Sequence, residues 1–453
     1  MSKQSEKLFD GITQIPDALA EQAQAAKTRR PRRLRILAPI AAVLALAVLA
    51  GVIFGNQGLI AYAISGASYP SQSQRVSMDA YQEGMAAFLT ATVPEFLSGH
   101  AGENAVYSPL NVYMALSMLA EVTDGEARAQ LLALLGSADV QTQREKAKAL
   151  WNNHYWSDEQ TKSLLANSLW LSEDLSYQKQ VLDTLAAEYY ASSFRGRMGA
   201  EGYDKALRKW INEQTNDLLK DQAAGLGMSP LTILALVSTI YFKASWGSEF
   251  DKAQTCQETF HAPTGDMTCD FLHGTRGALY AWGEGFTAAS LGTNSPAAML
   301  LILPDEGTSP EALLENAELL AFLSGGAYSK NTAENRTYTE VNFTVPKFDV
   351  ASDQDLCEGL ERLGVTAVFD AGSADFSPLT SDPAYVSQIR HAARLRIDEE
   401  GCEGAAYTVV NANTTESPAE EREPVDFVAD RPFLFLVCNN DGLPMFVGIV
   451  NQP

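Results

Sequence analysis

The longest apolar segment of the chain runs from residue 36 to residue 54 without a charged side chain. A helix of about 20 apolar residues crosses the roughly 30 Å hydrocarbon layer of a membrane. A dense basic cluster lies just before this run: Lys27, Arg29, Arg30, Arg32, Arg33 and Arg35. Such clusters stay on the cytoplasmic side, so the pattern predicts a cytoplasmic basic tail, 1–35, a transmembrane helix, 36–54, and export of everything that follows.

A cleaved signal peptide is the alternative interpretation of this run, because Ala61-Tyr62-Ala63 resembles a small-residue cleavage site. The apolar region of a signal peptide is shorter, and 35 residues precede the run here, so a retained anchor fits better. We therefore predict a single-pass protein of the cell membrane with an extracellular domain. Secretion after signal cleavage is the alternative localisation.

Beyond the apolar run, residues 55–77 are rich in Gly, Ser and Gln and predict a tether. Helical spacing begins near Met78, with apolar residues recurring three to four positions apart up to Leu89. A second helix is predicted after Ser108-Pro109. The pattern thus places one folded domain at 78–453.

Strand-like runs of aliphatic and β-branched residues recur along this domain. They span 164–171, 231–242, 298–303, 341–350, 394–397, 433–437 and 445–450. The last two are joined by a polar turn, 439–442, and predict a hairpin. Because helices and strands intermix without a regular βαβ alternation, the predicted fold class is α+β. One polar, acidic segment, 408–423, is too long for an ordinary connection and predicts a functional loop.

Net charge changes sign between the two parts of the chain. The whole chain carries −23, and residues 1–35 hold 8 basic and 4 acidic side chains, which leaves 25 basic against 52 acidic side chains beyond them. A domain this acidic repels nucleic acid, anionic membrane surfaces and sulfated sugars, so no nucleic-acid partner is expected. Its charge favours cationic partners instead.

Cysteine and histidine are dispersed along the chain without CxxC or HExxH spacing. They are Cys256, Cys269, Cys357, Cys402 and Cys438, and His100, His154, His261, His273 and His391. An odd number of cysteines cannot pair fully within one chain, so no disulfide framework is expected. No metal and no cofactor are expected either.

Eight short segments in a fixed order carry a resemblance to a known family. They are Asn104–Leu110 (NAVYSPL), Ala166–Trp170 (ANSLW), Ile211–Asn216 (INEQTN), Ile240–Trp246 (IYFKASW), Val345–Phe348 (VPKF), Leu363–Val365 (LGV), Ile397–Gly401 (IDEEG) and Ala429–Phe435 (ADRPFLF). Each segment alone is weak evidence. Together, from about residue 78 to Pro453, they resemble the serpin family in its bacterial type, here preceded by a membrane anchor.

The resemblance implies a fold with three β-sheets, eight or nine helices and an exposed reactive loop. It also implies a monomer that is not an enzyme and that inhibits serine proteases as a suicide substrate. A protease cleaves the loop, and the cut loop inserts into the large sheet as a new strand, carrying the acylated protease with it.

The resemblance places the hinge of this loop at Glu400, Gly401, Cys402, Glu403, Gly404, Ala405, Ala406, Tyr407 and Thr408. Side chains of an inserted strand alternate between its two faces. Counted from Gly401, every inward position is small, and the charged Glu403 and the bulky Tyr407 point outward. The hinge therefore keeps the parity that insertion needs, although Cys402, Gly404 and Tyr407 depart from the family's usual residues.

The resemblance also implies residues that control opening of the sheet. They are Ser108, Asn111, Ser238 and His391 beneath the sheet, and Lys243 and Trp246 where the loop enters it. The family usually has a serine at Asn111 and an asparagine at Ser238. We predict that the amide is retained from the helix and that His391 completes the polar network, in a structural role.

The reactive bond is predicted at Thr415-Glu416, about fifteen residues into the loop from Gly401, as in the family. Counting back from the strand after the loop gives Ala419-Glu420 as the alternative. Both bonds offer a small side chain to the primary pocket of a protease, which favours an elastase-like target. Arg422 lies too far along the loop to indicate a trypsin-like one.

Two other classes of function compete with protease inhibition. A non-inhibitory serpin would act as a cell-surface binding module, and its loop would be cut without forming a covalent complex. A hydrolase is disfavoured, because Ser176-Tyr177-Gln178-Lys179 matches the SxxK pattern of penicillin-binding enzymes but the accompanying SDN and KTG elements are absent from the chain.

Overall fold

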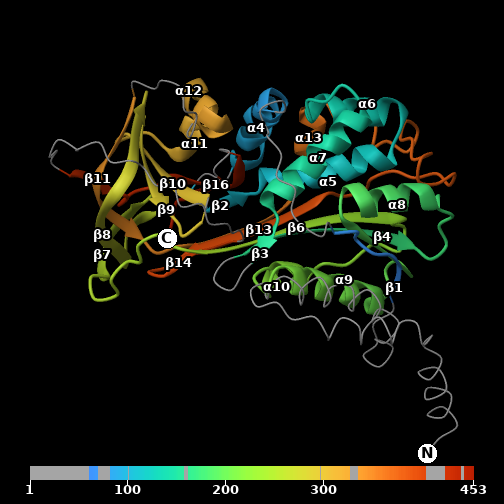
Figure 1. Ribbon diagram of the computed structural model, residues 1–453, viewed down its shortest axis with the longest axis horizontal. Coiled ribbons are helices and arrows are strands. Elements are labelled where there is room, and N and C mark those ends of the chain that lie inside the picture. Colours follow the sequence, from blue (N-terminus) through green and yellow to red (C-terminus); the bar gives the residue numbers. More distant parts are fainter. Residues whose placement is uncertain are drawn as a thin grey trace, which may run out of the picture. The chain divides into compact units, whose positions relative to one another are not determined.

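The computed structural model describes most of the chain after residue 60 (Figure 1). The described ranges are 61–69, 82–99, 102–157, 162–295, 297–326, 335–404, 424–439 and 443–453. The predicted basic tail, the apolar run 36–54 and both candidate reactive bonds lie outside these ranges. Within them, no helix combines the length and the hydropathy that a bilayer crossing requires.

The first sheet has eight strands in the described part of the chain. Their order is β1 (Tyr62–Ser65), β5 (Ala191–Gly196), β4 (Lys162–Ser172), β6 (Leu234–Ser245), β14 (Gly401–Gly404), β13 (Arg390–Ile397) and β12 (Asp349–Asp355), and the two-residue β3 (Trp156–Ser157) pairs with β4. All neighbours are antiparallel except β4 and β5. The four-residue β14 therefore lies between two longer strands, β6 and β13.

The second sheet has nine strands among the described residues. Their order is β15 (Val425–Val428), β11 (Arg336–Pro346), β8 (Gly265–Gly283), β9 (Phe286–Gly292), β10 (Ala297–Pro304), β16 (Phe433–Asn439), β17 (Pro444–Val450) and β2 (Ala105–Tyr107), and β7 (Cys256–Ala262) pairs with β8. The resemblance implies three sheets. Here two of them are continuous, because the 19-residue β8 pairs with β7 and β11 and, at its end, with β9.

Ten α-helices are present in the described ranges. They are α4 (Gln82–Leu97), α5 (Pro109–Val122), α6 (Gly125–Leu134), α7 (Val140–His154), α8 (Lys179–Glu188), α9 (Glu201–Gln214), α10 (Lys220–Ala224), α11 (Pro310–Leu313), α12 (Ala317–Ala321) and α13 (Cys357–Arg362), and a π-helical turn, η3 (Phe322–Gly326), follows α12. The last four α-helices have only four to six residues each, which explains why the count slightly exceeds the eight or nine implied by the resemblance.

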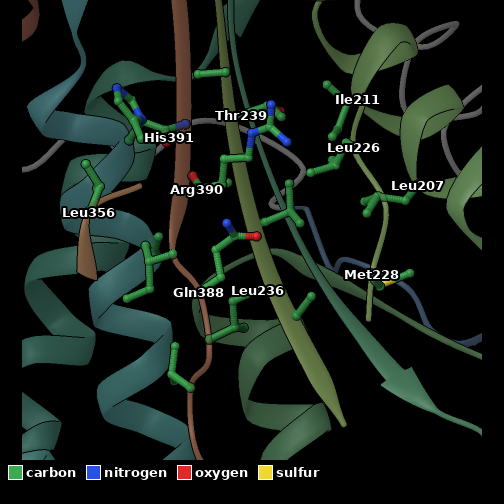
Figure 2. A pocket seen from close by; sticks show the side chains of 18 of the residues that line it. Leu207, Ile211, Leu226, Met228, Leu236, Thr239, Leu356, Gln388, Arg390 and His391 are labelled. Atoms are coloured by element: carbon green, nitrogen blue, oxygen red, sulfur yellow. The ribbon is translucent and has the colours of Figure 1, made fainter. Parts of the chain in front are cut away.

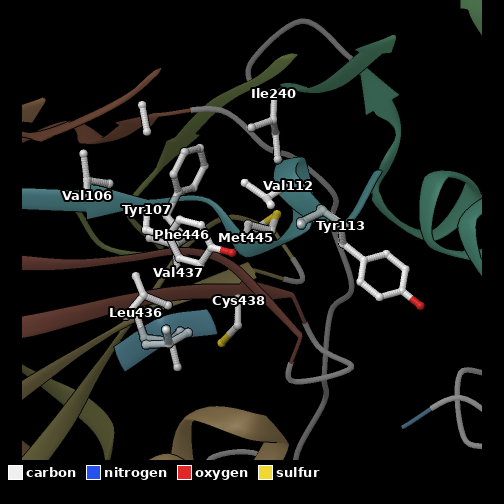
Figure 3. Packing of buried hydrophobic residues seen from close by; sticks show 14 of the residues in the cluster. Val106, Tyr107, Val112, Tyr113, Ile240, Leu436, Val437, Cys438, Met445 and Phe446 are labelled. Carbon is white, nitrogen blue, oxygen red and sulfur yellow. The ribbon is translucent and has the colours of Figure 1, made fainter. Parts of the chain in front are cut away.

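Helix α5 runs through the core because nearly all of its residues are buried. It begins as its sequence predicts, with Pro109 in the first turn and the Ser108 hydroxyl accepting a hydrogen bond from the Asn111 N–H at 3.3 Å. Figure 3 shows Val112 and Tyr113 of this helix among buried residues from the strands β2, β6, β16 and β17. The helix thus joins the two sheets into one core.

The first sheet is covered on both faces. Helix α5 lies on one face and α9 on the other (Figure 1), and α9 buries a smaller cluster that includes Trp170, Tyr203, Leu207 and Ile211. The two faces of the sheet are therefore covered by different helices.

Residues 61–69 belong to the folded domain, although their composition predicts a tether. The strand β1 pairs with β5, and the Tyr69 ring stacks on the Trp151 ring at 5.5 Å. A polar, Gly- and Ser-rich composition does not reveal this, because an edge strand needs partners on one side only and one aromatic anchor is enough to hold the segment.

The predicted strand 341–350 is two strands in the structure. β11 ends at Pro346 and β12 begins at Asp349, so the chain passes from the second sheet to the first between them. The Lys347 N–H donates to the Asp270 carbonyl at 2.8 Å at this crossing. A continuous β-like pattern cannot show a change of sheet, because both strands keep one buried face.

Candidate functional site

The predicted hinge begins with a tight turn between β13 and β14. The Asp398 carboxylate accepts hydrogen bonds from the backbone N–H groups of Glu400 at 2.9 Å and Gly401 at 3.0 Å. The Asp398 N–H in turn donates to the Gly401 carbonyl at 3.0 Å. These bonds satisfy the backbone of the turn and fix the point from which β14 starts.

Glycine is required at position 401 by close packing. A Cβ atom added to Gly401 would lie 2.1 Å from the carbonyl oxygen of Ala244 and 2.9 Å from the Ser245 Cα. Both of these atoms belong to the backbone of β6, so they cannot move aside as a flexible side chain can. Any larger residue would hold β14 away from β6.

The strand β14 is hydrogen-bonded on both sides. On β6, Gly401 lies opposite Ser245 and Gly404 lies opposite Phe242; on the other side, Glu403 lies opposite Arg396 of β13. Burial alternates from Cys402 to Gly404, because the Cys402 side chain is 2% exposed, Glu403 is half-buried and Gly404 is buried, while Gly401 is buried as well. This is the parity that the sequence pattern predicts for these residues, and residues 405–408 of the predicted hinge lie outside the described ranges.

Glu403 is held by two partners that the sequence pattern does not reveal. Arg396 donates to Glu403 Oε2 from Nε at 2.9 Å and also from Nη2, and the Tyr241 hydroxyl donates to Oε1 at 2.9 Å. Burial would raise the pKa of Glu403, but these hydrogen bonds outweigh it and the pKa is lowered from its ordinary value. The carboxylate therefore ties β14 to strands on both of its sides.

Trp246 and Lys243, which the resemblance places where the loop enters the sheet, both lie beside the hinge. The Trp246 ring is buried, its Nε1–H donates to the Asp398 carbonyl at 2.8 Å, and its backbone N–H donates to the Glu400 carbonyl at 3.0 Å. Lys243 is exposed and lies opposite Glu403 in the register of β6 and β14. Trp246 thus stabilises the turn through hydrogen bonds to two of its carbonyl groups.

Beyond Gly404, β6 and β13 border an open slot. We use "the slot" for the space between Leu234–Thr239 of β6 and Val386–Ala392, which includes the start of β13. No backbone hydrogen bond joins these two stretches in the described part of the chain. A cavity of about 310 Å³ lies there instead. Figure 2 shows Leu207 and Ile211 of α9 on one side of it and His391 and Leu356 on the other.

His391 lies at the wall of the slot and binds the start of α5. Its Nε2 accepts a hydrogen bond from the Ser108 backbone N–H at 3.0 Å, and the Tyr107 ring meets the imidazole edge-on at 5.4 Å. Burial lowers the pKa of His391 to about 4, and the Asp353 carboxylate opposes this only in part. The imidazole is therefore neutral at physiological pH, as its role as an acceptor requires.

Of the four residues predicted beneath the sheet, two are in direct contact and two are not. Ser108 and His391 are directly bonded, and the Ser108 hydroxyl also donates to the Met445 carbonyl at 2.7 Å. Asn111 and Ser238 both line the slot. Among the described residues, neither of their side chains is hydrogen-bonded to His391, so the predicted network of Asn111 with His391 is not formed there.

Comparison with known proteins gives the family. Residues 83–453 match the family model described as Serpin (serine protease inhibitor), and the chain belongs to the serpin family. An uncharacterized serpin-like protein of Thermococcus kodakarensis is 29% identical over 365 residues, which cover 77% of this chain and 81% of that protein. Serine proteinase inhibitor A3K of Cavia porcellus is 27% identical over 423 residues, which cover 90% of this chain and 97% of that protein.

Solved structures share the fold. The native state of tengpin, a thermophilic serpin, has a TM-score of 0.73 at 24% identity and covers 86% of this chain and 100% of tengpin. Thyroxine-binding globulin in complex with thyroxine has a TM-score of 0.69 at 20% identity and covers 82% of this chain and 99% of that protein. The α+β serpin fold predicted from the sequence is confirmed. Serpins are mostly protease inhibitors and not enzymes.

Proposed function

We propose that this chain is a suicide-substrate inhibitor of serine proteases that acts by cleavage and insertion of its reactive loop. The observation that carries the proposal is the slot, where two facing strand edges share no backbone hydrogen bond within the described ranges. Unpaired strand edges are templates for an added strand. The strand β14 already occupies the entrance of the slot and points into it.

The register of β14 supports this route for the rest of the hinge. Extended by the same register, the strand would place Thr408 between Ser238 and His391, and Ala406 would face Ile240. These inward positions would meet the face covered by α5, whose residues Asn111, Val112 and Leu116 line the slot. Small side chains can enter there without moving the helix.

The free energy of insertion is large enough to drive inhibition. About a dozen new backbone hydrogen bonds, at about 1 kcal/mol net each, would release on the order of 10 kcal/mol. This is comparable with the whole stability of an ordinary domain. The uncut protein would therefore be metastable with respect to the inserted form.

We further propose Thr415-Glu416 as the bond that the protease attacks, with Ala419-Glu420 as the alternative. The protease serine would form an ester with the carbonyl of Thr415 and release the amine of Glu416 on the other fragment. A small residue at this position suits an elastase-like protease. The acidic residues that follow, including Glu420 and Glu423, would attract a cationic one.

The proposed location is the cell membrane, with the serpin domain outside and residues 36–54 as a retained anchor. We propose in addition that the protein is a bacterial-type serpin and a monomer. The strand β1 supports retention over cleavage, because it begins at Tyr62. Signal cleavage after Ala63 would remove half of this four-residue strand and its pairing with β5.

The test is incubation of the full chain with a panel of serine proteases, followed by a denaturing gel and mass spectrometry of the released C-terminal peptide. We expect a covalent complex with an elastase-like protease, cleavage after Thr415, and a Tm of the nicked protein well above that of the intact one. Nicking without a complex and without a rise in Tm would refute the proposal.

A matched pair of neighbouring alanines sharpens this test. Ala406→Arg places a charge on the inward face and should abolish both the complex and the gain in heat resistance. Ala405→Arg makes the same change on the outward face and should keep both. Equal behaviour of the two variants would show that insertion with this parity does not occur.

A non-inhibitory binding module is the second candidate. Its support is the likeness to thyroxine-binding globulin, a protein of the same fold solved in complex with a small ligand. The protease panel separates the two functions, because a binding module would be nicked without retaining the protease.

A further inference from the structure

A second cluster of reactive side chains lies on the hairpin of β7 and β8, apart from the residues that line the slot. Cys256 and Glu258 are two positions apart on β7 and so share a face, and His273 lies on β8. Glu258 Oε1 is 2.9 Å from His273 Nε2. Cys256 Sγ is 3.5 Å from both of these atoms.

We propose that Cys256, Glu258 and His273 bind a zinc ion. In tetrahedral zinc sites the bonds to sulfur are about 2.3 Å and those to nitrogen and oxygen about 2.0–2.2 Å. These lengths set the sulfur about 3.6 Å from each of the other two ligand atoms, close to the 3.5 Å found here. Only the carboxylate oxygen must withdraw slightly from His273 Nε2.

The donor set favours zinc over the hard cations. Thiolate and imidazole ligands suit zinc, whereas magnesium and calcium prefer oxygen ligands alone. In the described part of the chain, three residues of the cluster can each offer one ligand atom, and Cys256 is exposed to solvent. Three protein ligands with solvent access leave the fourth position to water, the arrangement of an open zinc site.

The second ring nitrogen of His273 has a partner that orients the ring. His273 Nδ1 lies 3.4 Å from the Thr344 hydroxyl of β11, and the two residues are opposite each other in the ladder of β8 and β11. With Nδ1–H donated to Thr344, the lone pair of Nε2 points at the cluster. Hydrogen-bonded histidines of this kind are typical of metal ligands.

The sequence predicts no metal because its cysteines and histidines lack the short spacings of metal sites. The hairpin nevertheless brings two of them together in space. Cys256 and His273 are far apart in the chain but meet because β7 folds back on β8. An ion here would clip the two strands together. It would also lie one strand away from β15, because β11 pairs with both β8 and β15.

Zinc would have to displace a proton from the cysteine. Zinc binds the thiolate form of cysteine, and the ordinary pKa of a cysteine thiol lies above neutral pH. Binding of zinc to the thiolate therefore releases a proton. Calorimetry in two buffers of different ionisation enthalpy measures this release.

The test is calorimetric titration of the reduced, metal-free full chain with zinc sulfate, with thermal unfolding as a second readout. We expect one zinc ion per chain and a rise in Tm. Cys256→Ser and His273→Gln should each weaken binding at least tenfold and remove the rise in Tm. Cobalt should give a thiolate charge-transfer band with the wild type that Cys256→Ser lacks.

Matched controls lie on the same hairpin. Cys269→Ser changes the cysteine opposite Glu258, and His261→Gln changes a histidine paired with Asp266 at 2.8 Å. Both should bind zinc as the wild type does. Thr344→Val should weaken binding about tenfold at unchanged stoichiometry, because it only positions a ligand.

Three results would overturn the assignment. The wild type could bind no zinc, the two ligand variants could bind it as tightly as the wild type, or Cys269→Ser could lose as much affinity as Cys256→Ser. Circular dichroism of each variant checks that the fold is intact, which these solvent-accessible substitutions should leave unchanged.

Discussion

The two sheets of this serpin differ in how completely their neighbouring strands are paired. In the second sheet, β16 and β17 pair residue by residue from Phe433 to Val437, the register shifts once before Cys438, and every residue of both strands is buried. In the first sheet, among the residues that the structure describes, β6 and β13 are joined only through the four residues of β14, and a cavity of about 310 Å³ follows. The second sheet is thus tightly packed along β16 and β17, whereas the described part of the first sheet contains a cavity between two of its strands.

If the proposed function is right, the difference marks where the uncut fold would gain stability on insertion. Interiors are close-packed, and lost contacts around a void cost free energy. A sheet with a void between two strands is therefore poised to gain when a strand of suitable residues arrives. The second sheet has no comparable gap between β16 and β17, so it would stay fixed while a strand enters the first sheet.

The largest effect on the free energy of unfolding is expected from truncating a buried side chain of the second sheet. Leu436→Ala removes a fully buried side chain of β16 and should lower the free energy of unfolding by about 4 kcal/mol, because the packed surroundings cannot collapse into the space. Leu236→Ala truncates a residue that lines the slot and should cost about 1 kcal/mol or less. Urea unfolding of the uncut proteins measures both values. Similar losses would mean that the slot is as tightly packed as the second sheet.

A smaller effect, dependent on pH, is expected from His391. Its pKa is lowered from 6.5 to about 4 in the folded protein, so the unfolded chain binds the proton first as the pH falls. The stability that neutral His391 contributes is complete above pH 6.5 and is lost between pH 6.5 and 4, by about 3 kcal/mol in total. Urea unfolding across this range should show a steeper decline for the wild type than for His391→Gln. Parallel profiles would contradict the buried, neutral state.

The smallest effect is expected at the hinge. Glu403→Gln removes the charge that Arg396 binds and should weaken docking of β14 by about 1 kcal/mol, or about fivefold. Alkylation of the buried Cys402, followed by peptide mass spectrometry, measures how often the hinge leaves the sheet.

Glu400→Gln is the matched control for the hinge. It removes the pair of Glu400 with Lys252, whose nitrogen and oxygen are 2.6 Å apart on exposed side chains. Exposed pairs contribute little, so Cys402 should react as in the wild type. An equal increase in both variants would assign the effect to the turn and not to Glu403.

Much of the fold follows from local patterns in the sequence. The hairpin of β16 and β17 and the start of α5 are predicted to within a few residues, because buried strands and capped helices leave strong local signals. The break between β11 and β12 is not predicted, since the change of sheet at Lys347 depends on what surrounds the chain. The place of residues 61–69 is hidden for the same reason.

The candidate site divides in the same way. The parity of Cys402 and Glu403 follows from the period of a strand alone. The partners of Glu403 do not, because Arg396 and Tyr241 become neighbours only through the pairing of three strands. Alternating charges in β13 and its neighbours are the one signal that could have indicated such cross-strand pairs.

The tight turn at Asp398 fixes the residue from which the length of an inserted strand is counted. A strand advances about 3.3 Å per residue, so with Gly401 held by this turn, a partner attached at Thr415 would lie about 46 Å from Gly401 along the fully inserted strand. Attachment at Ala419 would lengthen this distance by about 13 Å. The turn at Asp398 would thus fix the point from which the inserted length is counted. Inserting two residues after it would lengthen the inserted strand and leave the inward and outward positions unchanged.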